Sequence, residues 1–105
     1  MNTLDDKEEG FIKLIQDNIN LSERKISEIN YEKSDLWRIE YYQRLIDNLM
    51  KMKESVIAKK FPRPSSGFSP GVTNIGVTRY LGEWCDDEDV IEIARKLEAF
   101  YREKY

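Results

Sequence analysis

The residues that interrupt helices are confined to one short stretch of this chain. All three prolines and four of the five glycines lie between residues 62 and 82, and the remaining glycine is Gly10. Proline fixes φ and lacks a backbone N–H, and glycine readily adopts turn conformations, so local chain geometry governs this stretch. The sequences on either side are free to form long helices, and we expect the 61–84 segment to be a loop that they present.

Apolar side chains outside this loop recur at spacings of three, four and seven residues, which is the pattern of amphipathic helices. Thr3 and Asp86 are good helix N-caps, each followed by acidic residues that suit the first turn of a helix. We predict an all-α protein with one domain spanning residues 1–105 and with helices at 4–31, 35–60 and 86–104.

Two arrangements of the first two helices are compatible with the sequence. In a helical hairpin that turns near Lys33, the isoleucines of the first helix pack at once on the second. In the alternative, one continuous rod runs to Lys60 and finds its apolar partners in other chains. We favour the hairpin because it buries these side chains within one molecule.

The loop itself has two parts. Residues 61–71 are rich in turn formers, whereas residues 72–81 contain β-branched side chains, so a short β-hairpin around 73–80 is also compatible with the sequence. Three aromatic side chains are expected to hold the loop against the helices, namely Phe61, Phe68 and Trp84.

The overall composition excludes several classes of protein. No apolar run approaches the about 18 residues of a membrane span, and the acidic N-terminal sequence is unlike a signal peptide, so we expect a cytoplasmic protein. Cys85 is the single cysteine, which excludes an internal disulfide. The chain has no histidine, so the His-dependent nucleophilic and zinc sites are excluded. We therefore expect no enzymatic activity.

Charge distinguishes the loop from its flanks. Residues 48–82 carry six basic residues and one acidic residue, although the whole chain has a net charge of −3. Guanidinium groups, hydroxyls and backbone N–H groups near glycine are what a phosphate site uses, and aromatic rings can stack on a nucleobase. The sequence predicts a small anion-binding site formed by Lys60, Arg63, Ser65, Ser66, Phe68, Thr78, Arg79 and Tyr80.

Two further features have simpler explanations. The acidic run at 86–89 has the spacing of a capped helix start and lacks a calcium-loop pattern, so we predict no metal site. Cys85 has acidic neighbours, which disfavour a thiolate, and we expect a buried and inert side chain.

We therefore predict a non-enzymatic oligomeric protein, with no cofactor, that captures a phosphate-bearing ligand such as a nucleotide. Its acidic character disfavours binding to long nucleic acid. The alternative is an adaptor or inhibitor that binds another protein through the loop and the aromatic side chains of the helices. Two aromatic-rich segments, 37–42 and 100–105, exceed what one small core needs and favour a homo-oligomer.

Overall fold

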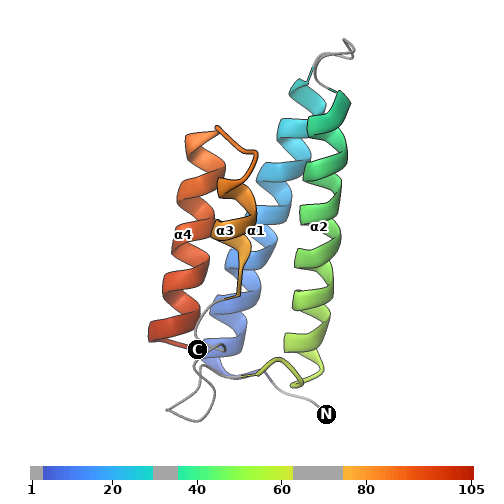
Figure 1. Ribbon diagram of the computed structural model, residues 1–105. Helices are drawn as coiled ribbons and strands as arrows, with labels where there is room; N and C mark the ends of the chain where they lie inside the picture. Colours follow the sequence, from blue (N-terminus) through green and yellow to red (C-terminus); the bar gives the residue numbers. More distant parts are fainter. Residues whose placement is uncertain (1–3, 30–35, 63–74) are drawn as a thin grey trace.

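The computed structural model describes residues 4–29, 36–62 and 75–105 (Figure 1). These residues form four helices and no strand, so the all-α prediction is confirmed. The three predicted helices correspond to α1, α2 and α4 with slightly shorter bounds, and a further short helix lies in the predicted loop. The bounds are α1 Asp6–Glu28, α2 Leu36–Ile57, α3 Val77–Gly82 and α4 Glu88–Glu103.

Helices α1 and α2 run antiparallel and pack side by side (Figure 1). Lys53 Nζ donates a hydrogen bond of 2.6 Å from α2 to Gln16 Oε1 of α1. Two separate packed helices are observed in place of the continuous rod. The connection near Lys33 lies outside the described residues.

Helix α1 begins at a capping box rather than at Thr3, so the predicted cap is wrong. The Asp5 carboxylate accepts from the Glu8 N–H at 2.7 Å, and the Glu8 carboxylate accepts from the Asp5 N–H at 2.9 Å. This reciprocal arrangement satisfies two N–H groups that the first turn leaves unpaired, which fixes the start of the helix.

The buried face of α1 contains polar as well as apolar side chains. Phe11 and Ile15 are fully buried, and so are Asn18 and Ser22 on the same face. The face is buried along its length because α1 contacts both α2 and α4. Ser22 Oγ lies 3.5 Å from Asn18 Oδ1, so this pair meets part of its hydrogen-bonding need inside the helix.

Helix α2 ends in a Schellman motif. The Lys60 N–H donates to Ser55 O at 2.8 Å, and the Lys59 N–H donates to Val56 O at 3.0 Å. Lys59 has a left-handed φ of 59°, a conformation that favours glycine. Its ammonium lies 2.7 Å from Glu8 Oε1, which ties the end of α2 to the start of α1.

Helix α3 corrects the prediction of a short strand or hairpin around 73–80. Val77 and Leu81 are both buried, and their i, i+4 spacing places them on one face of a helix. Thr78, which we assigned to the extended segment, instead donates its N–H to Glu98 Oε1 of α4 at 2.8 Å. Residues 73–74 lie outside the described residues.

Helix α4 begins at Glu88, two residues after the predicted start at 86, and its N-cap is Asp87 in place of Asp86. The Asp87 carboxylate makes no cap hydrogen bond and accepts instead from the Tyr42 hydroxyl. Lys25 Nζ lies 2.9 Å from Asp89 Oδ2 and joins α1 to the first turn of α4.

Aromatic packing closes the end of the bundle where α4 finishes. The Phe61 ring centroid lies 5.7 Å from that of Phe11 and 5.6 Å from that of Tyr101.

Trp84 packs on Tyr42 with a centroid distance of 4.8 Å. Phe61 and Trp84 therefore contact the core as predicted, and Phe68 lies outside the described residues.

None of the described helices has the length and apolar character that crossing a bilayer requires.

Candidate anion-binding site

Helix α3 is held against the rest of the bundle at both of its ends. Gly76, with a left-handed φ of 80°, turns the chain into the helix, and the Tyr80 N–H donates to Gly76 O at 3.0 Å. The buried carboxylate of Glu98 receives the Thr78 N–H at the first turn. Leu81 is fully buried near the other end. This docking leaves a depression between the exposed sides of the two helices.

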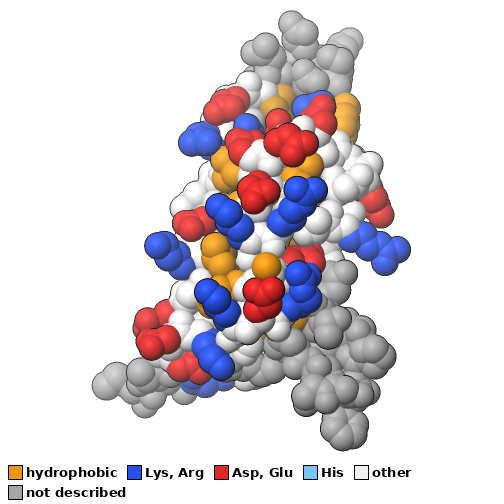
Figure 2. Space-filling view, turned by 90° about the vertical axis from the view of Figure 1, so that its left-hand side faces the viewer, with side chains coloured by type: hydrophobic (Ala, Val, Ile, Leu, Met, Phe, Trp, Pro, Cys, Tyr) orange, Lys and Arg blue, Asp and Glu red, His pale blue; other side chains and the backbone are white. Residues whose placement is uncertain are grey.

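We call this depression the arginine hollow, and it has a volume of about 510 Å³. Three arginines against one glutamate give its lining a formal charge of +2. Figure 2, which looks onto the α4 side, shows basic side chains across the middle of this face. The lining consists of Thr78, Arg79, Arg95, Glu98, Ala99 and Arg102.

The polar groups of the hollow are available to different degrees. Arg95 Nη1 lies 3.8 Å from Glu92 Oε2, whereas neither Arg79 nor Arg102 forms an ion pair within the described part of the chain. The Thr78 Oγ1 atom is buried and has no hydrogen-bond partner among the described residues. Two guanidinium groups are therefore available to an anion at this surface, and the Thr78 hydroxyl is buried beside them without a partner among the described residues.

The structure brings together only part of the predicted site. Thr78 and Arg79 line the arginine hollow, whereas Lys60 is exposed just beyond the end of α2. Tyr80 does not line this hollow. The other predicted residues lie outside the described residues, namely Arg63, Ser65, Ser66 and Phe68.

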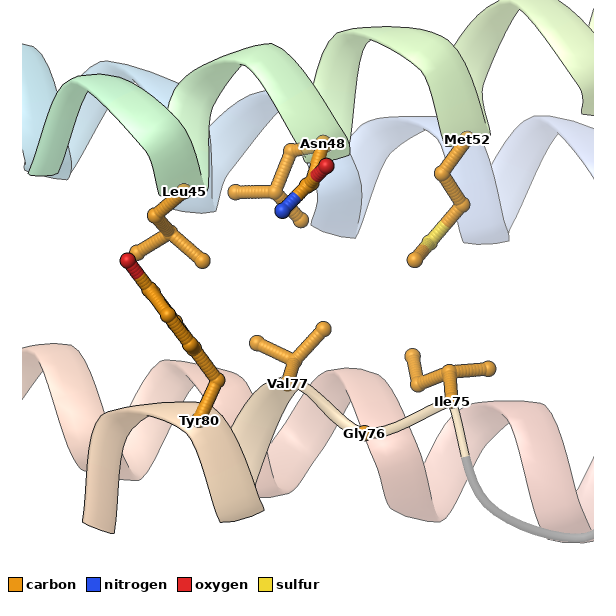
Figure 3. Close-up of a pocket in the computed structure, with 8 residues that line it drawn as sticks. Leu45, Asn48, Met52, Ile75, Gly76, Val77 and Tyr80 are labelled. Atoms are coloured by element: carbon orange, nitrogen blue, oxygen red, sulfur yellow. The ribbon is translucent and has the colours of Figure 1, made fainter. Parts of the chain in front are cut away.

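Tyr80 belongs instead to a small apolar pocket between α2 and the 75–80 segment (Figure 3). Its ring reaches towards Leu45, and its hydroxyl donates to Tyr41 O at 3.2 Å. Burial raises the pKa of Tyr80 above its usual value. The pocket has a volume of about 130 Å³ and is lined mainly by apolar side chains, and Asn48 contributes an amide group to the lining. These properties suit apolar packing rather than anion recognition.

Arg95 and Arg102 were missed as site residues because basic residues near the end of a helix also complement its dipole. The spacing of these two arginines also indicates that they share one face of the helix. Positions 95, 98, 99 and 102 are related as i, i+3, i+4 and i+7, so they lie on one face of α4. That face lines a hollow only because α3 brings Thr78 and Arg79 beside it.

Three of the four carboxylates of the acidic run contact other side chains. Asp86 lies 3.4 Å from Arg38 Nη2, Asp87 accepts from Tyr42, and Asp89 pairs with Lys25. Burial raises the pKa of the nearby Cys85 thiol, which disfavours the reactive thiolate. Within the described residues, no three acidic or cysteine side chains are arranged to hold a metal ion.

A second depression, which we call the α1–α2 groove, has a different character. It has a volume of about 360 Å³ and combines apolar side chains with charges of both signs. Met50 and Ile57 are 48% and 44% exposed, high values for large apolar side chains. The groove is lined by Gln16, Ile19, Glu23, Ile46, Met50, Lys53, Glu54 and Ile57.

Comparisons of the chain with protein families, with curated proteins and with solved structures found no match. The assignment of function therefore depends on the chemistry of these surfaces.

Proposed function

We propose that this protein is a non-enzymatic binding protein that holds a small phosphate-bearing anion in the arginine hollow. The observation that carries the proposal is the convergence of Arg79, Arg95 and Arg102 beside the Thr78 hydroxyl. Guanidinium groups bind phosphate oxygens through paired N–H donors, and a hydroxyl can add a further hydrogen bond. The 61–84 segment thus contributes Thr78 and Arg79, and α4 contributes the other two arginines.

The charge distribution favours a small ligand over a polymer. The hollow has a formal charge of +2, whereas the whole chain has a net charge of −3. A long nucleic acid would extend beyond the hollow over a molecule whose net charge is negative, which disfavours its binding. Lys60, Arg63, Ser65, Ser66 and Phe68 remain predicted contributors to the same ligand. The single carboxylate of the hollow, Glu98, already accepts a backbone hydrogen bond and is not free to act as a catalytic acid or base. The hollow is therefore suited to binding a ligand rather than to catalysis.

Titration with inorganic pyrophosphate tests the proposal. The Arg102→Ala variant should bind pyrophosphate about 10- to 100-fold more weakly, because a charge-assisted hydrogen bond contributes roughly 1.5–3 kcal/mol. Isothermal titration calorimetry at low ionic strength measures the affinity. Arg24→Ala is the matched control, since Arg24 is exposed on α1 and pairs only with Glu28 at 3.7 Å. Equal affinity of the Arg102→Ala variant and the wild type would show that the hollow is not the site.

A second candidate function is self-association through α2. Four large apolar side chains are exposed in the described structure, all on this helix, at Leu36, Trp37, Met50 and Ile57. Most of the other aromatic residues that favoured an oligomer are used internally, because Tyr42, Tyr101 and Tyr105 are buried. We propose a second copy of the chain as the partner. Lys53 lines the α1–α2 groove together with Glu23 and Glu54, so two copies related by a two-fold axis can pair opposite charges.

Sedimentation velocity over a range of concentrations tests the self-association. The double variant Met50→Lys, Ile57→Lys should associate at least about tenfold more weakly, because both substitutions place charge in an apolar contact. Raising the salt concentration should weaken pyrophosphate binding markedly and self-association only slightly. The control is Lys51→Met, an exposed α2 position outside the groove. A wild-type monomer at every concentration would contradict self-association and leave the adaptor alternative.

A further inference from the structure

A second hollow adjoins the first on the outer side of α4. We call it the Phe100 hollow; it has a volume of about 300 Å³ and lies between α1 and α4. Ala99 lines both hollows, so the two hollows meet at this residue. The lining of the Phe100 hollow consists of Leu14, Lys96, Ala99, Phe100, Glu103 and Lys104.

The Phe100 ring is fixed in this hollow by the sequence of α1. A Cβ atom at Gly10 would lie 2.7 Å from Phe100 Cζ, so the ring can approach α1 closely only because that residue is glycine. The ring is nearly parallel to Phe11, with an interplanar angle of 9° and centroids 6.1 Å apart. Lys104 Nζ lies 5.8 Å from the Phe100 centroid. The hollow therefore offers a positioned aromatic ring with cations beside it.

The two hollows differ in the chemistry that they can recognise. The arginine hollow provides guanidinium groups and a hydroxyl, which suit phosphate. The Phe100 hollow provides an aromatic ring with Lys104 Nζ over it and the apolar side chain of Leu14, and Lys96 and Glu103 complete its charged lining. A nucleobase presents a flat π-face that packs on such a surface irrespective of its identity.

We infer that the two hollows form one nucleotide site, in which the phosphates bind the arginines and the base packs against Phe100 and Leu14. This inference rests on the proposed function. Both hollows flank one helix, whose diameter with side chains is about 10–12 Å, so one nucleoside diphosphate can reach from one to the other across Ala99. The base is thereby assigned to Phe100, in place of the predicted Tyr80, which faces α2.

Comparing ADP with pyrophosphate for each variant tests the inference, because the two ligands share the same phosphate groups. The wild type should bind ADP about tenfold more tightly than pyrophosphate, the scale of one base-stacking contact. Leu14→Ala removes part of the surface on which the base packs and should reduce this advantage while changing pyrophosphate affinity by less than about twofold, because Leu14 does not line the arginine hollow. Leu21→Ala is the matched control, the same substitution at a partly buried leucine that lines neither hollow.

A second measurement locates the base directly. Selective labelling of leucine methyl groups should show nuclear Overhauser contacts between Leu14 and the base protons of bound ADP, and Phe100→Leu should lower ADP affinity about tenfold. If Phe100→Leu fails to fold, the affinities of Leu14→Ala and the Leu14 methyl contacts in the wild type decide between the two outcomes. Failure to bind pyrophosphate overturns the proposed function as well. Pyrophosphate binding without any preference for ADP overturns only the nucleotide assignment.

Discussion

The arginine hollow and the α1–α2 groove are both open depressions on one small helical bundle, yet their chemistry differs. The hollow has a formal charge of +2 and no large apolar side chain, whereas the groove contains four large apolar side chains. Charge attraction favours a small anion in the first, and removal of water from apolar surface favours a protein partner in the second.

The two surfaces also depend on different parts of the structure. The groove lies between α1 and α2, long helices that pack on each other directly. The hollow depends on α3, which has six residues and is held on α4. Perturbing α3 should therefore affect anion binding and leave the groove intact, whereas perturbing the α1–α2 pair should do the reverse.

The largest expected effect comes from Leu81→Ala. Leu81 is fully buried, and truncating a buried leucine costs about 2–5 kcal/mol of unfolding free energy. We expect pyrophosphate affinity to fall as well, because α3 keeps Val77 as its other buried anchor but docks less firmly. Chemical denaturation and calorimetry at a temperature where the variant remains folded measure both quantities. Loss of self-association together with anion binding would show that the two surfaces are not separate.

Helix α3 shows where sequence reasoning reached its limit. Long apolar periodicity was enough to predict α1, α2 and α4, because each repeats the pattern over several turns. In α3 the pattern is one pair, Val77 and Leu81, bracketed by glycines. Its first turn depends on Glu98, a carboxylate twenty residues away in sequence, so tertiary structure decides between helix and strand there.

The candidate site was predictable to a similar extent. Local charge and composition indicated Thr78 and Arg79, which the structure places in one hollow. They could not indicate Arg95 and Arg102, because a basic helix end has an ordinary explanation in the helix dipole. They also could not place Tyr80, since the direction of its side chain depends on the helical turn that the sequence left undetermined.

A smaller effect is expected from Glu98→Gln. The glutamine oxygen can still accept the Thr78 N–H, so the unfolding free energy should change little. Removing the only carboxylate of the hollow should strengthen pyrophosphate binding roughly fivefold, since unit charges a few Å apart in a well-solvated site interact by about 1 kcal/mol. Glu98→Ala is the companion variant and should cost about 1–3 kcal/mol of stability, because it leaves the Thr78 N–H unpaired. Unchanged or weaker pyrophosphate binding by Glu98→Gln would remove the electrostatic basis of the site.

The smallest expected effect is a loss of stability at acidic pH, through the ion pair that joins the end of α2 to the start of α1. The hydrogen bond from Lys59 lowers the pKa of Glu8 below its usual 4.5. A carboxyl whose pKa is lower when folded stabilises the protein above its unfolded pKa and loses this contribution as pH falls through the folded value. The difference in unfolding free energy between the wild type and Lys59→Met should therefore be largest near neutral pH and should shrink below about pH 4.5. Urea denaturation at several pH values measures it.

The control for this titration is Lys51→Met, which removes the same charge from an exposed α2 position with no ion pair in the described part of the chain. Its difference from the wild type should be small at every pH. Lys59→Met should bind pyrophosphate like the wild type at neutral pH, because Lys59 joins the ends of α1 and α2 and does not line the arginine hollow. A stability difference that stays constant from neutral to acidic pH would mean that Lys59 does not act through Glu8, since methionine keeps the left-handed backbone and removes only the ammonium. The α1–α2 pair would then have no acid-sensitive contact at the end of α2, and its response to acid would no longer distinguish it from the hollow.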